Sequence, residues 1–172
     1  MEVSDALVTW LRARLDEDEL WAKAASAGLK ADDGTVPGGV HWTWAIGDQW
    51  EPVQPDPLEP YMGGHDGQWS QPVVLRTVEE WRLDWGGPDN TLPVKIAESE
   101  ELRTADGAHI ARHDPARVLR EVEAKRRIVD VAGRRLDRYI GTGAQVAFEW
   151  LTLRLLALPY DDRDGYREEW RP

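Results

Sequence analysis

Hydrophobic residues recur at helical spacing near both ends of the chain. Close to the N-terminus, Leu, Trp and Ala residues fall every three or four positions, which predicts a helix over residues 1–27. Ser4 is the expected N-cap, and Gly28 is the expected stop. A second helix should begin at Asp114 and Pro115, because aspartate caps helices and proline suits the first helical position.

The helix expected from Pro115 has an apolar seam and a basic face. The seam repeats about every 3.5 residues and consists of Val118, Val122, Val129, Ala132, Leu136 and Tyr139. Arg120, Arg127 and Arg134 are spaced by seven on the opposite side. We interpret this face as solvated and partly neutralised by i,i+4 pairs of Arg127 with Glu123 and of Arg134 with Asp130. Docking of the face against an acidic surface is the alternative.

The last expected helix is apolar on nearly all sides. Residues 146–158 are mostly Val, Phe, Trp and Leu, and Pro159 ends the run. Thr142, followed by Gln145 three residues later, resembles a capping box. This helix and the seam offer more apolar surface than a small sheet can cover. We therefore expect the surplus to contact a protein partner, with a second copy of the chain among the candidates.

The middle of the chain has the composition of strands separated by loops. Residues 40–46, 72–79 and 92–97 are rich in Val, Leu, Ile, Thr and Trp, and glycines and prolines mark loops at 32–39 and 51–71. Trp81, Leu83 and Trp85 alternate with polar residues and extend the second of these strands.

An α+β fold follows from this order of elements. We expect a single domain over residues 1–172, with the N-terminal helix first. A small antiparallel sheet of three to four strands should occupy residues 40–98, with the long loop at 51–71. Two or three helices should fill residues 108–172.

Charge and composition indicate which partners and which cellular compartment to expect. The net charge is −11, and residues 1–114 hold nine basic and 22 acidic residues, so binding to nucleic acid is not expected. A run of four acids at 16–19 is interpreted as a solvated turn, with a docking patch as the alternative. The chain has no cysteine, no run long enough to span a membrane and no signal peptide at its start, so we expect a cytoplasmic protein.

Candidate chemistry is sparse. His109 and His113 are four apart and could share a helix face as metal ligands, although two structural histidines explain them as well. Ten tryptophans are unusual, and two pairs could line a groove or fill the core: Trp42 with Trp44, and Trp81 with Trp85. No phosphate-binding loop, dinucleotide fingerprint or nucleophile elbow is present. No cofactor and no catalytic residue is expected.

Three segments resemble a family of short, uncharacterised actinobacterial and actinophage proteins. They are AHIARHDPARVLREVEAKRR at residues 108–127, LRARLDEDE at 11–19, and LRLLALPYD with YREEWRP at 153–161 and 166–172. The resemblance covers both ends and the long helix. It implies a source and an architecture, and no reaction. The high share of Arg among the basic residues agrees with a high-GC genome, and a phage or mobile-element origin fits the resemblance.

These observations favour a non-enzymatic accessory or interaction protein that binds a protein partner and self-associates. A metal-dependent enzyme that uses His109 and His113 is one alternative. An acidic decoy, which would occupy a nucleic-acid-binding protein through the charge of residues 1–114, is another.

Overall fold

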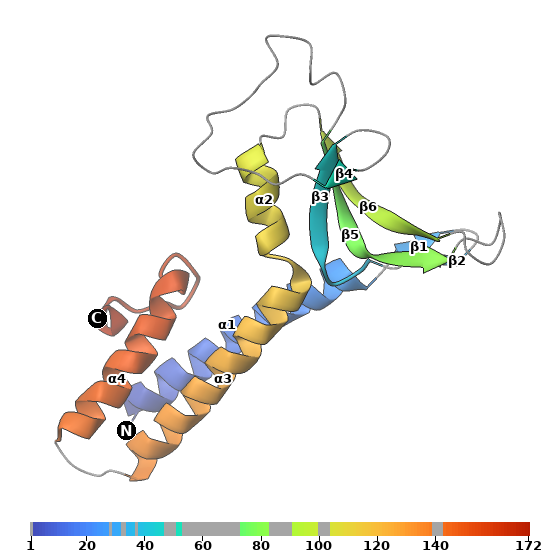
Figure 1. Cartoon of the computed structure of the whole chain (residues 1–172). Helices are drawn as coiled ribbons and strands as arrows, with labels where there is room; N and C mark the ends of the chain where they lie inside the picture. Colours follow the sequence, from blue (N-terminus) through green and yellow to red (C-terminus); the bar gives the residue numbers. More distant parts are fainter. Residues whose placement is uncertain are drawn as a thin grey trace. The chain divides into compact units, whose positions relative to one another are not determined.

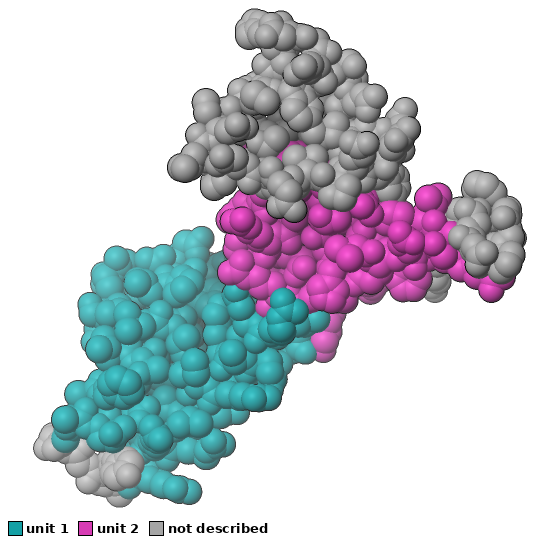
Figure 2. Space-filling model, in the orientation of Figure 1, with its two compact units in different colours: residues 1–21, 119–172 teal, residues 22–118 magenta. Residues whose placement is uncertain are grey.

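The computed structural model (Figure 1) describes residues 2–27, 29–31, 34–36, 38–46, 51–52, 73–82, 91–99, 104–138 and 143–172. Two compact units are coloured separately in Figure 2. The helical unit comprises residues 1–21 and 119–172, and the sheet unit comprises residues 22–118. Each of the two units has buried apolar side chains of its own, and the single domain over residues 1–172 stays a prediction.

Three helices contribute to the helical unit: α1 (Glu2–Ser26), α3 (Pro115–Arg138) and α4 (Ala144–Ala157). Within this unit they lie side by side (Figure 1). A Cβ atom at Gly133 of α3 would lie 3.5 Å from Cγ2 of Val8 in α1, so these two helices are in van der Waals contact. The fully buried side chains include Leu7, Leu11 and Leu15 of α1, Val122, Val129 and Ala132 of α3, and Leu153 and Ala157 of α4.

Two 3₁₀ turns, η1 (Leu158–Tyr160) and η2 (Glu168–Trp170), follow α4. The indole nitrogen of Trp10 donates a hydrogen bond to the carbonyl of Asp164 at 2.9 Å. The rings of Trp10 and Trp170 pack with centroids 5.3 Å apart. Gly165 has φ +81°, and a Cβ there would come within 3.1 Å of the Trp10 indole nitrogen, so this turn requires glycine. The C-terminal segment is thereby fastened to α1.

The sheet unit contains an antiparallel sheet of four strands in the order β4-β3-β5-β6. The strands are β3 (Trp42–Ile46), β4 (Glu51–Pro52), β5 (Val73–Arg82) and β6 (Thr91–Ser99). Their positions confirm the predicted sheet and the α+β class. Leu83 and Trp85, expected to continue the second strand, lie outside the described residues, as does most of the predicted 51–71 loop.

A short hairpin was missed by the sequence reasoning. β1 (Leu29–Ala31) pairs with β2 (Gly34–Val36) in antiparallel fashion; β2 lies within the predicted loop at 32–39, and no element had been predicted at β1. Strands of three residues are too short to show alternation, so only pairing identifies them. The helix α2 (Thr104–Arg112) packs beside β3 (Figure 1), and Trp44 and Leu75 form a small core with Trp42, Ile96 and Ala111.

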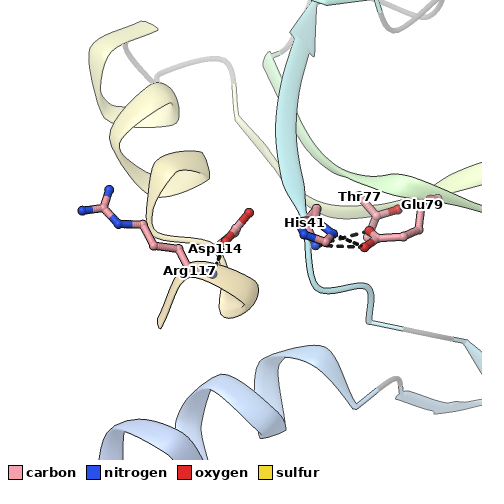
Figure 3. Close-up of polar contacts among 5 residues, drawn as sticks. All are labelled: His41, Thr77, Glu79, Asp114 and Arg117. Carbon is pink, nitrogen blue, oxygen red and sulfur yellow. Dashed lines mark hydrogen bonds and ion pairs between the residues drawn. The ribbon is translucent and has the colours of Figure 1, made fainter. Parts of the chain in front are cut away.

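The predicted start of α3 is confirmed, and two other predicted caps are wrong. The backbone N–H of Arg117 donates to Oδ1 of Asp114 at 2.7 Å (Figure 3), and Pro115 is the first helical residue. α1 begins at Glu2, so Ser4 lies inside the helix and is not its cap. The cap of α4 is Gly143, with no side-chain hydrogen bond, which displaces the capping box proposed for Thr142.

No helix in the described ranges combines the length and the apolar character needed to cross a bilayer.

Candidate interaction surface

The outward side of α4 carries a continuous row of exposed apolar side chains. Phe148, Leu151, Leu155 and Leu158 are between 38% and 61% exposed. Their spacing of three, four and three residues places them on one side of consecutive helical turns. Ala144 and Ala147 are exposed and share this side by helical spacing. We call these six residues the α4 outer face; it contains no charged residue.

The opposite side of α4 is held in the core by apolar contacts and by a buried carboxylate that pairs with a half-exposed arginine. Glu149 is 3% exposed, and its Oε1 atom accepts hydrogen bonds from Nη1 of Arg135 at 2.8 Å and Nε2 of Gln145 at 2.6 Å. A buried carboxylate without such partners would be costly, so the pair fixes the rotation of α4 about its axis. That rotation keeps Leu153 and Ala157 inside and the α4 outer face outside.

The α3 seam, which the sequence suggested for partner contact, is covered mainly by the chain itself. Val122 and Val129 are buried, and Val118 and Leu136 are half-buried. Tyr139 lies outside the described residues. Because α1 supplies leucines to the same core, the two buried valines are core residues and offer no surface to a partner.

All four acids of the run at 16–19 have partners in the helical unit. Nη2 of Arg126 lies 2.5 Å from both Oδ1 of Asp16 and Oε2 of Glu19. Glu17 pairs with Arg14 at 3.2 Å. The Tyr160 hydroxyl donates to Oδ2 of Asp18 at 2.5 Å. These contacts hold α1 against α3 and η1. The run was interpreted from the sequence as a solvated turn, but its side chains stabilise the packing of the helical unit.

Burial and the neighbouring acids shift the pKa of two of these groups. Burial is the main reason that the pKa of Tyr160 is raised well above its usual range, and the hydrogen bond to Asp18 adds to this. The hydrogen bonds to Glu19 and Asp16 likewise raise the pKa of Arg126, against a smaller opposing effect of burial. Both groups therefore keep their protons, as these contacts require.

The basic face of α3 is only partly neutralised as predicted. Nε of Arg127 donates to Glu123 at 2.8 Å, which confirms one i,i+4 pair. Asp130 does not form the expected pair with Arg134. It accepts a hydrogen bond from Arg12 of α1 at 2.7 Å, which links the two helices. Arg120 and Arg134 are exposed.

A histidine–glutamate pair in the sheet unit escaped the sequence reasoning (Figure 3). Nδ1 of His41 lies 2.7 Å from Oε1 of Glu79, and the backbone N–H of His41 donates to the same oxygen at 3.1 Å. The two residues are 38 positions apart and meet only because β3 pairs with β5 in the register that places Trp42 opposite Thr77. Without that register, no spacing in the sequence could have identified the pair.

The surroundings of the His41–Glu79 pair explain its geometry. Burial would raise the pKa of Glu79, but hydrogen bonds from its own backbone and from His41 outweigh this and lower the pKa. The buried hydroxyl of Thr77 donates to the carbonyl of Glu79 at 2.7 Å and accepts from the backbone N–H of Val94 at 2.8 Å. Gly39, with φ +65°, packs so closely on Thr77 that any Cβ would clash. The pair closes the chain turn that precedes β3.

His109 and His113 do lie together. Their ring centroids are 4.3 Å apart, and Nδ1 of His113 donates to the carbonyl of His109 at 2.8 Å. The described residues contain no group of three or more His, Asp or Glu side chains arranged to hold a metal ion. Of the two other histidines of the chain, His41 is bonded to Glu79, and His65 lies outside the described residues.

The tryptophans divide between core and surface. Trp44 is buried and Trp42 packs against it, so this pair belongs to the core of the sheet unit rather than to an open groove. Trp81 is exposed at the end of β5. Trp85, its proposed companion, lies outside the described residues.

A comparison with protein-family models gives one match for the chain. The model of the family described as "Family of unknown function (DUF6221)" matches residues 4–172. This chain belongs to the DUF6221 family. The match includes the tryptophan-rich middle as well as both ends and the long helix, to which the resemblance in the sequence was limited. Neither the curated proteins nor the solved structures gave a match.

Proposed function

We propose that this DUF6221 protein is a non-enzymatic accessory protein that binds a protein partner through the α4 outer face. The observation that carries the proposal is the exposed, charge-free row of large apolar side chains on α4, in a chain of net charge −11. Scattered single apolar residues are normal on protein surfaces, but a continuous row along one helix side is typical of a docking site.

The binding free energy that each surface could contribute favours the α4 outer face over the basic face of α3. Fully burying one such side chain contributes about 1.5–3 kcal/mol, so four half-exposed side chains contribute roughly 4 kcal/mol when covered. That corresponds to a factor of about 1,000 in affinity. An exposed ion pair of Arg120 or Arg134 with an acidic partner would contribute about 0–1 kcal/mol.

A non-enzymatic role is supported by how the polar residues of the sheet unit are used. The hydroxyl of Thr77 already makes two hydrogen bonds, and Glu79 binds both the ring and the backbone of His41. These groups stabilise a chain turn and are not placed as a nucleophile activated by a base.

The metal-enzyme alternative is supported only by the proximity of His109 and His113, because two imidazoles suit a metal such as zinc. Metal analysis of the purified protein, together with melting in the presence of chelator, tests it. Bound metal and a lower melting temperature with chelator would favour this alternative, whereas no metal and unchanged melting would eliminate it. The decoy alternative depends on the net charge alone, since the acids at 16–19 are bonded within the helical unit.

An actinobacterial or phage source and a cytoplasmic setting complete the proposal. The segment at residues 108–127 and the predominance of Arg over Lys support the source. The absence of cysteine supports a reducing compartment.

Capture of partners with matched variants tests the proposed docking surface. Full-length protein and the variants Phe148→Glu, Leu155→Glu and Leu92→Glu would be immobilised and exposed to actinobacterial lysate, and bound proteins quantified by mass spectrometry. Leu92 is a suitable control because it is about as exposed as Leu155, at 47% and 52%, but lies on β6. We expect at least tenfold less capture with the two α4 variants and unchanged capture with the control. Equal capture by all four proteins, together with self-association that the two α4 variants leave unchanged, would refute the proposal.

A further inference from the structure

Five of the six positions on the α4 outer face are symmetric about Leu151; Phe148 is the exception, because the position three residues after Leu151 is Arg154. Ala147 and Leu155 lie four residues before and after it, and Ala144 and Leu158 lie seven residues before and after it. The two positions before Leu151 are small, and the two after it are large. All five residues are exposed.

Such a pattern is complementary to itself. If a second α4 lay antiparallel across the first, with a two-fold axis at Leu151, then Ala147 would face the second copy's Leu155. Ala144 would face its Leu158. Each large side chain would meet a small one at both ends of the contact, which allows the helix axes to approach within the usual 8–10 Å or so. An antiparallel arrangement also places each helix end near the oppositely charged end of the other helix dipole.

We infer that the partner covering the α4 outer face is a second copy of this chain, docked antiparallel about a two-fold axis at Leu151. This inference rests on the proposed function and specifies its partner. Charge restricts where two copies can meet: copies that each carry −11 repel one another over much of their surfaces, whereas no like charges are opposed where both faces are uncharged.

The exposed area sets the strength of the contact. Phe148, Leu151, Leu155 and Leu158 together expose about as much as two full side chains, roughly 350 Å² per copy. Standard interfaces bury about 800 Å² per partner, so this one belongs to the weak, reversible class. A dissociation constant on the order of 10–100 µM is expected.

Sedimentation equilibrium between about 5 and 300 µM tests the association, a range chosen to bracket the expected constant. The wild-type protein should pass from the 19.5 kDa monomer to a species of twice that mass. Leu151→Glu and Leu155→Glu should weaken dimerisation at least tenfold, while Leu92→Glu should leave it unchanged. Melting curves of dilute protein would verify that each variant is folded. A wild-type protein that remains monomeric over the whole range would overturn the inference.

The absence of cysteine in the natural chain makes disulfide cross-linking a clean test of register. Cysteines cross-link only when their Cα atoms come within about 7 Å. Under mild oxidation, Leu151→Cys should cross-link with itself. Ala144→Cys should cross-link with Leu158→Cys in a mixture of the two proteins and should not cross-link with itself. Self-linking of Ala144→Cys, without the mixed product, would overturn the antiparallel arrangement.

The outcomes separate this inference from the proposed function. A monomeric wild-type protein that still captures another protein through the α4 outer face would leave the docking surface standing and remove the second copy as its partner. If neither association nor capture depends on Leu151 and Leu155, both fail together.

Discussion

The α3 seam and the α4 outer face are both rows of apolar residues at helical spacing, yet only one is covered by the chain. Val122 and Val129 of the seam are buried in the helical unit, whereas Leu151 and Leu155 of α4 are about half-exposed. The apolar seam of α3 faces the core, and most of the other residues of α3 are charged, although Ile128 and Val131 are exposed at 42% and 39%. α4 is apolar all round, and three packed helices can bury only one side of it.

This difference shows that hydrophobicity alone does not distinguish core from interface. What distinguishes the two sides of α4 is a polar contact: Glu149 and Arg135 bind each other and fix which side faces inward. Because that side of α4 faces the core, the α4 outer face on the opposite side is exposed. The predictions below test this contrast, beginning with the largest expected effect.

Truncating leucines on the two sides of α4 should have very different costs. Leu153→Ala should lower the free energy of unfolding by about 2–5 kcal/mol, because Leu153 is fully buried. Leu155→Ala should change it by about 0.5 kcal/mol or less. Urea denaturation at low micromolar concentration, where any dimer is dissociated, would measure both. Equal costs would mean that the chain itself covers the outer face.

Removing the cation that fixes the rotation of α4 should also be costly. Arg135→Ala leaves the buried Glu149 carboxylate with Gln145 as its remaining partner from the pairs described above, and should cost about 1–3 kcal/mol. The neighbouring Arg134→Ala is the control and should stay within about 0.5 kcal/mol. Thermal melting of the two variants would measure the difference. Indistinguishable melting would show that the ion pair does not orient the helix.

The contact between η1 and α1 offers a smaller effect. Tyr160→Phe removes the hydrogen bond to Asp18 and should cost about 1 kcal/mol. Tyr166→Phe is the control, because its buried hydroxyl has no hydrogen-bond partner among the described residues, so its loss should be neutral or slightly stabilising.

The pH dependence of the Tyr160 contact has a definite sign. The pKa of Tyr160 is raised in the folded protein, so its contribution is fully present below the pKa of an unfolded tyrosine, about 10, and is lost as the pH rises through the folded value. Titration followed by tyrosinate absorbance should therefore show one tyrosine that ionises late, and Tyr160→Phe should abolish it. An unchanged titration in that variant would contradict the assignment.

The smallest expected loss of stability concerns the His41–Glu79 pair of the sheet unit. This pair has no part in the difference between the two sides of α4, so it serves as an independent comparison. The pKa of Glu79 is lowered by folding, so its contribution is present above the unfolded value, about 4.3, and is lost as the pH falls through the folded value. Glu79→Gln should remove up to about 1 kcal/mol of that acid-sensitive stability, since the side chain is partly exposed. Acid titration of the unfolding free energy of variant and wild type would measure it.

Much of the architecture was predictable because local chemistry decides it. Asp114 and Pro115 mark the start of α3 by capping rules, and the strand segments show their composition directly. Short elements and terminal caps were missed. The hairpin of β1 and β2 is too short for a pattern, and Ser4 met the rules for an N-cap that the helix did not use.

The sequence by itself determined where α3 begins, which side of α3 is apolar, and that α4 carries more apolar surface than one core side needs. These properties follow from spacing and residue type within one element. The tertiary structure decided that α1 covers the α3 seam and that the acids at 16–19 bind Arg126, Arg14 and Tyr160. It also decided that His41 meets Glu79 and which side of α4 faces outward. Each of these depends on residues far apart in the chain, whose meeting is set by packing and strand register.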